Sequence, residues 1–96
     1  MEQIIKQNLE NTERIMKNAQ GYVVCNNKYG TIATSSYDNT VSVGIIKLIC
    51  RILVSAARSA VRDVDSTNDL TFLRIATRKF EYLVAPETDF TIVVVQ

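Results

Sequence analysis

The segment 41–62, VSVGIIKLICRILVSAARSAVR, constrains the fold of this chain more than any other feature. If the segment is helical, each residue advances by about 100°, and its apolar residues then cover an arc of roughly 240°. A helix lying on one sheet needs an apolar stripe of only about 100°. The segment therefore predicts a long helix with a sheet on one side and surplus apolar surface that needs a second partner.

The remaining strip of this helix is basic. Lys47, Arg51, Arg58 and Arg62 share it with Ser55, and it contains no acidic residue. The strip can be a solubilising face, or it can approach an acidic peptide or phosphates. No aromatic residue lies between the cations, and the formal net charge is only +1. These observations favour an acidic protein partner and argue against nucleic acid.

Strand patterns flank the helix on both sides. Residues 22–25 and 31–34 predict a hairpin through the Asn- and Gly-containing turn 26–30, and residues 2–19 before them predict an amphipathic helix. Three more strands are expected at 70–76, 80–85 and 90–95, the last as a central strand because it is apolar at nearly every position. The order helix-strand-strand-helix-strand-strand-strand predicts a single α+β domain over 1–96, with helices packed on a mostly antiparallel five-stranded sheet.

Residues with chemical reactivity are sparse. The chain has no histidine, its three glycines form no phosphate-binding motif, and Cys25 and Cys50 lie in apolar stretches typical of buried, inert thiols. The acidic residues Asp63, Asp65 and Asp69 resemble a solvated turn more than a cation loop, which would need a Gly and a distal Glu. We therefore expect no catalytic residue, no cofactor and no metal site.

The sequence also indicates where the protein is found. The longest uncharged run, 18–27, is far shorter than the ~20 apolar residues of a membrane-spanning helix. Lys6 follows Ile4 and Ile5 at once, which leaves no apolar stretch of a secretory leader. We expect an intracellular protein without membrane insertion.

One long block resembles a known family. The run 57–75, ARSAVRDVDSTNDLTFLRI, is similar to the signature block of the roadblock-type dynein light chains. The resemblance continues through 84–86 and 89–90 to the apolar end 92–96, and it also covers 21–24 and 38–39. Ser66 stands where the family commonly has proline. The resemblance spans about the whole chain and is closer in the second half.

The resemblance implies a non-enzymatic homodimer that binds the dynein intermediate chain and supports motor assembly and cargo attachment in microtubule-based movement. It implies a cytoplasmic, cytoskeleton-associated location and leaves cytoplasmic and axonemal dynein open. Edge strands 70–76 of two copies would join, with the long helices packed together. The implied dimer contacts are Ile45, Ile49, Ile52, Leu53, Thr71, Leu73 and Ile75.

The intermediate chain would bind to the helices of both copies. The residues expected to contact it are Ile46, Lys47, Arg51, Ala57 and Arg58, with Leu53 as a further apolar anchor. Related domains also act as scaffolds or regulators of small Ras-like GTPases. That role remains the alternative function at this point.

Overall fold

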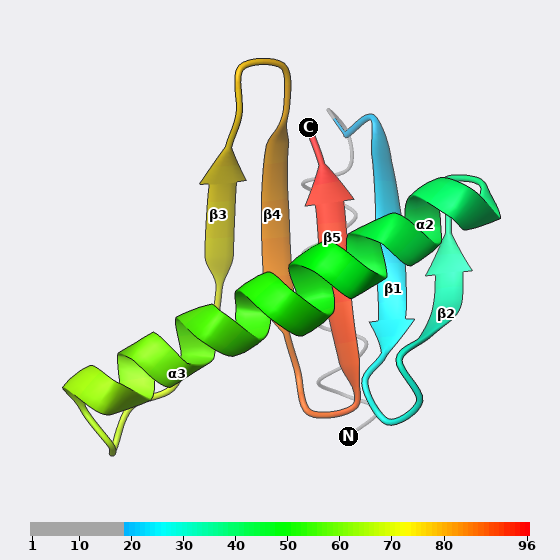
Figure 1. Ribbon diagram of the computed structural model, residues 1–96. Coiled ribbons are helices and arrows are strands. Elements are labelled where there is room, and N and C mark those ends of the chain that lie inside the picture. Colours follow the sequence, from blue (N-terminus) through cyan, green and yellow to red (C-terminus); the bar gives the residue numbers. More distant parts are fainter. Residues whose placement is uncertain (1–18) are drawn as a thin grey trace.

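A five-stranded antiparallel sheet forms the centre of the molecule. The structure, a computed structural model, describes residues 19–96. The strands lie in the order β2-β1-β5-β4-β3 (Figure 1). The central position expected for the last strand is confirmed, because β5 pairs with both β1 and β4. Apart from Ala19, the helix expected at 2–19 lies outside the described residues. The strand bounds are β1 Gly21–Asn26, β2 Thr31–Ser35, β3 Leu73–Ala76, β4 Glu81–Pro86 and β5 Phe90–Val95.

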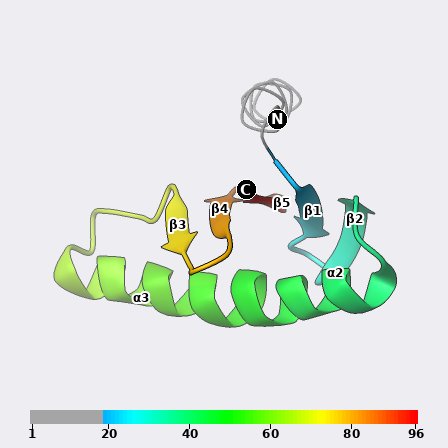
Figure 2. The same ribbon diagram turned by 90° about the horizontal axis from the view of Figure 1, so that it is seen from above.

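One continuous helix crosses a face of this sheet diagonally (Figure 1) and forms a separate layer when the sheet is seen from above (Figure 2). Its parts are α2 (Asn39–Ile45), the π-helical segment η1 (Ile46–Leu53) and α3 (Val54–Val64). The helix begins two residues earlier than predicted because the Asp38 side chain accepts a 2.8 Å hydrogen bond from the Val41 N–H and caps the first turn. The predicted α+β fold is confirmed.

The core on the helix side contains two small clusters. Ile46 packs with Val23 and Cys25 in one of them, and Val54 packs with Val84 and Val93 in the other. Ile46, Cys50 and Val54 are spaced by four residues, so they follow one another along the side of the helix that faces the sheet. This spacing fixes which side of the helix is buried.

The strand predicted at 70–76 is shorter in the structure and begins at Leu73. The reason lies in the residues before it. The Asp69 carboxylate accepts a hydrogen bond from the Leu70 N–H and forms an ion pair with Arg58 of α3. These contacts attach residues 69–70 to the helix, and pairing with β4 starts only at Leu73. The strand predicted at 80–85 is shifted by one residue, to Glu81–Pro86.

By length and composition alone, the helix Asn39–Val64 is apolar enough to cross a membrane, because its apolar 18-residue window has a mean hydropathy of 1.8. Counting uncharged runs missed this property, because Lys47 and Arg51 interrupt the run. Length and composition are weak evidence for a membrane span, since this helix packs on its own sheet through Ile46 and Val54. Only 17% of the apolar window is buried in the single chain, so most of its surface is left uncovered.

The central strand gives a direct test of the core. Val93 is 0% exposed and packs beneath the helix, whereas Val64 at the end of α3 is 90% exposed. Val93→Ala should lower the free energy of unfolding by roughly 1–3 kcal/mol, because it removes buried methyl groups and leaves a cavity. Val64→Ala, the same chemical change at the surface, should change it by less than about 0.5 kcal/mol. Urea unfolding followed by circular dichroism measures both values, and equal losses would contradict the described core.

Candidate functional site

The long helix carries an exposed apolar surface. Leu48 is 59% exposed, Ile52 58% and Leu53 40%, and Ala56 follows on the same side. We call these four residues the apolar helix face. The surplus apolar surface expected from the sequence is present, and Ile52 and Leu53 are part of it. Leu48 was not among the expected contacts, although its place four residues before Ile52 could have identified it.

Other expected dimer contacts already have partners within the chain. Ile45 and Ile49 are half-buried and pack against the core under the helix. On β3, Leu73 and Ile75 point to the same core, while Arg74 lies on the opposite side and pairs with Glu81 of β4. These four apolar residues position the helix and β3, and only their remaining exposed surface can contact another chain.

The strand β3 forms one edge of the sheet and pairs only with β4 within residues 19–96. Thr71 does not belong to it, contrary to the expected strand 70–76. Thr71 is exposed and lines a groove on the helix side, because Asp69 attaches this stretch to α3. The helix that carries the apolar helix face continues as α3, which passes over β3 and extends beyond it (Figures 1 and 2).

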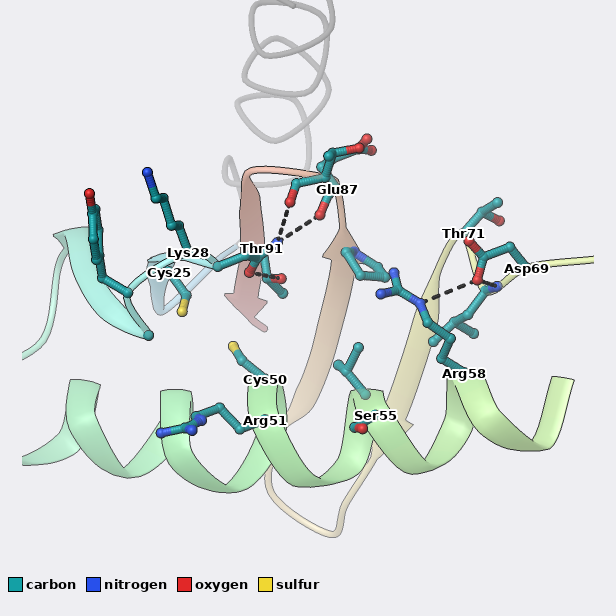
Figure 3. Close-up of a pocket in the computed structure, with 17 residues that line it drawn as sticks. Cys25, Lys28, Cys50, Arg51, Ser55, Arg58, Asp69, Thr71, Glu87 and Thr91 are labelled. Atoms are coloured by element: carbon teal, nitrogen blue, oxygen red, sulfur yellow. Dashed lines mark hydrogen bonds and ion pairs between the residues drawn. The ribbon is translucent and has the colours of Figure 1, made fainter. Parts of the chain in front are cut away.

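A groove of about 710 Å³ runs along the other side of the helix. Its walls are the helix, the β1–β2 hairpin, the β4–β5 turn and the stretch 69–71 (Figure 3). Cys25, Cys50 and Val54 are among its apolar lining residues. We call this cavity the basic groove because its lining includes the cations Lys28, Arg51 and Arg58.

Asn27 holds one wall of the basic groove in place. Its side-chain amide donates hydrogen bonds to the carbonyls of Glu87 at 2.7 Å and Thr88 at 3.3 Å. Its side-chain oxygen accepts a 2.7 Å hydrogen bond from the hydroxyl of Thr91, which is 3% exposed. The Asn27 backbone N–H also donates to the Asp89 carbonyl at 2.8 Å. The hairpin and the β4–β5 turn are therefore fixed relative to each other.

Charges are distributed unevenly along the groove. Arg58 Nε lies 3.2 Å from Asp69 Oδ1, close enough for an ion pair although this buried nitrogen is not aligned for a hydrogen bond. Arg62 Nη2 lies 3.7 Å from the second oxygen of Asp69. Arg62 therefore pairs with Asp69 and not with its nearer sequence neighbours Asp63 and Asp65. The Asp65 side chain instead accepts hydrogen bonds from Thr67, which lower its pKa.

At the hairpin end, the positive charge is not neutralised. Arg51 lies against Gly30, with its Nη1 3.8 Å from the place where a Cβ would stand there. Lys28 Nζ lies 5.3 Å from the centre of the Tyr29 ring. Neither cation has an acidic partner within 4.0 Å among the residues that the structure describes. This end of the groove is positively charged.

Both cysteines lie in the floor of the groove. Burial raises the pKa of the Cys50 thiol to about 12 and also raises the pKa of Cys25. Both groups are therefore protonated and uncharged near neutral pH. This agrees with the inert thiols expected from the sequence, although Cys50 is only half-buried.

The residues expected to bind a partner fall into three groups. Ile46 is wrong as an anchor, because it is 4% exposed and packs against the sheet with the four-residue spacing of Cys50 and Val54. Lys47 and Arg51 are exposed, but only Arg51 reaches the basic groove. Ala57 and Arg58 are half-buried, and Arg58 is held by Asp69.

The contacts of Asn27 predict a structural cost when they are lost. Asn27→Ala should reduce the free energy of unfolding by roughly 1–2 kcal/mol, because the nearly buried Thr91 hydroxyl loses its acceptor and two turn carbonyls lose a donor. Lys28→Ala, at the neighbouring exposed position, should change it by less than about 0.5 kcal/mol. Thermal unfolding of both variants measures the difference, and an Asn27→Ala variant as stable as Lys28→Ala would show that the groove wall does not depend on this side chain.

Comparison with protein families agrees with this architecture. The model of the Roadblock/LC7 domain matches residues 6–96. The match covers both sheet edges, the long helix and all residues of the basic groove. This family includes dynein light chains and regulators of Ras-like GTPases, and it is generally non-catalytic. The chain is a member of the Roadblock/LC7 domain family.

Proposed function

We propose that this protein is a non-catalytic dynein light chain that acts as a homodimer and binds the dynein intermediate chain. The proposal of a homodimer rests on two features, the exposed apolar helix face and the open edge of β3. Leu48, Ile52 and Leu53 are large apolar side chains with 40–59% of their surface exposed on one side of one helix. A continuous apolar surface of this kind favours coverage by another chain.

A second copy is the occupant that fits both features at once. Two copies related by a two-fold axis can pair β3 with β3 in an antiparallel ladder and extend the sheet. Because α3 extends beyond β3, the helix of each copy then lies over the sheet of the other, next to its partner helix (Figure 2). Pairing of the two β3 strands gives hydrogen-bond partners to their unpaired backbone N–H and C=O groups, and packing of the two helices covers the apolar helix face.

The choice of partner rests on charge and on family. Roadblock domains generally form dimers and bind partner proteins. The exposed cations Lys47 and Arg51 favour an acidic segment. The block 57–75 resembles the light-chain version of the domain, which favours a dynein intermediate chain over a small GTPase. The proposal implies a cytoplasmic location on the cytoskeleton and a role in motor assembly and cargo attachment.

The dimer proposal is tested by changing its central contact. The native protein should sediment at about twice its chain mass of 10.8 kDa. Ile52→Asp should shift it to a monomer at micromolar concentration, because a charge enclosed by an apolar contact costs several kcal/mol. Val64→Asp, an exposed position on the same helix, should leave the mass unchanged. A native protein that is monomeric at all concentrations would contradict the proposal.

The partner proposal predicts that overlapping segments of the intermediate chain from the same cell include one that binds the dimer. Micromolar affinity is expected, because folding of a disordered segment on binding costs about 2–5 kcal/mol of the interaction energy. Isothermal titration measures this binding, with a small Ras-like GTPase from the same cell as the second ligand. Binding of the GTPase without binding of any segment would favour the GTPase-regulator function instead.

A further inference from the structure

We propose that the basic groove is a second binding site, separate from the dimer surface, for an extended acidic peptide segment. A carboxylate of the segment would pair with Arg51 at the hairpin end, a second acidic residue would pair with Lys28 at the rim, and an apolar side chain of the segment would lie on the floor of the groove. The proposal rests on the proposed function only for the identity of the protein that supplies the segment.

The groove is separate from the apolar helix face because the two use different sides of one helix. Arg51 and Arg58 line the groove, while Leu48, Ile52, Leu53 and Ala56 form the apolar helix face. On a helix that advances by about 100° per residue, the midpoints of these two sets lie roughly 135° apart. A second copy that covers the apolar helix face therefore leaves the groove accessible.

The size and construction of the groove suit a short segment. Its volume of about 710 Å³ lies within the range of about 300–1,000 Å³ that is typical of ligand sites. The Asn27 hydrogen bonds fix the hairpin to the β4–β5 turn, and the Arg58–Asp69 ion pair fixes the stretch 69–71 to the helix. Two opposite ends are thus held before any ligand arrives, which lowers the entropic cost of binding.

The charges within the groove select a negative ligand. Asp69 is already engaged by two arginines, and Figure 3 shows the Glu87 side chain directed away from the helix. Arg51 comes from the helix and lies against the hairpin at Gly30, while Lys28 comes from the hairpin and its ammonium is directed away from the helix (Figure 3). A carboxylate at Arg51 would gain a charge-assisted hydrogen bond, and a second acidic residue of the segment would pair with Lys28 at the rim.

The floor favours an apolar side chain next to that carboxylate. Val54 is 4% exposed and Cys25 2%, and Cys50 lies beside them on the helix. Both thiols stay uncharged near neutral pH, because burial raises the pKa of each. The segment expected here therefore contains acidic and apolar residues in alternation.

A phosphate ligand fits less well. Among residues 19–96, Gly30 is the only glycine lining the groove, and the helix N-terminus at Asn39 does not border it. Backbone N–H groups at glycine-rich loops and helix N-termini are the usual means of binding phosphate, and neither is available here. Two exposed cations on different walls suit the spread charges of a peptide better.

The test uses the full-length protein labelled with ¹⁵N and a capped six-residue peptide of alternating glutamate and leucine. Chemical shifts should change around Arg51, Lys28 and Val54 and should saturate. The same peptide with glutamine in place of glutamate should bind about tenfold more weakly, a difference of about 1.4 kcal/mol. Arg51→Glu should weaken binding of the acidic peptide by at least about tenfold, because it reverses the charge that faces the carboxylate.

Lys79→Glu is the matched control, because Lys79 is an exposed cation in the β3–β4 turn that does not line the groove. It should change the affinity by less than about threefold, through long-range charge alone. The proposal is overturned if the glutamine peptide binds equally well, if the shifts map to Leu48 and Ile52, or if inorganic phosphate displaces the peptide at equal concentration.

The two binding experiments separate this proposal from the proposed function. If the acidic peptide binds in the groove but no intermediate-chain segment binds the dimer, the groove proposal is supported and the proposed partner is wrong. If an intermediate-chain segment binds the native protein but the acidic peptide does not, the proposed partner is supported and the groove proposal is wrong.

Discussion

The structure depends on a helix that has more apolar surface than its own sheet can cover. The spacing of Ile46, Cys50 and Val54 fixes one side of the helix on the sheet. Leu48 and Ile52 then point away from the sheet, with more than half of each side chain exposed. Burying the exposed part of each side chain is worth roughly 1–2 kcal/mol, so covering them favours association. The same helix thus covers one face of the sheet through Ile46 and Val54 and carries exposed apolar surface on another side.

Two different surfaces follow from this single orientation. The apolar helix face and the open edge of β3 both suit a second copy of the chain. Arg51, Ser55 and Arg58 of the basic strip form one wall of the basic groove, and Arg51 lies against the β1–β2 hairpin. Because Asn27 and Asp69 fix the other walls independently, the groove does not need a second chain to exist. Assembly and recognition of an acidic partner can therefore take place on the same domain without competing.

Much of the fold could be predicted from the sequence, because its signals are periodic. The hairpin, the long helix and the central position of β5 follow from apolar spacing and turn residues. The bounds of β3 could not be predicted in this way, since the contact of Asp69 with Arg58 competes with strand pairing and joins residues distant in sequence. The prediction that Ile46 contacts a partner was wrong for a related reason. An apolar arc of roughly 240° shows that surface is in excess, but it does not say which residues meet the sheet. The basic groove was not predicted, because its walls come from separate parts of the chain that meet only through the fold.

The central claim is that a second copy covers the apolar helix face and the edge of β3, while the edge of β2 stays open. Amide hydrogen exchange measured residue by residue at two protein concentrations tests this claim directly, with β2 as the internal control. The account predicts slow exchange for the outward-facing amides of β3 at high concentration, loss of that protection on dilution below the dimer dissociation constant, and fast exchange for those of β2 throughout. Equally fast exchange at both edges at high concentration would contradict it.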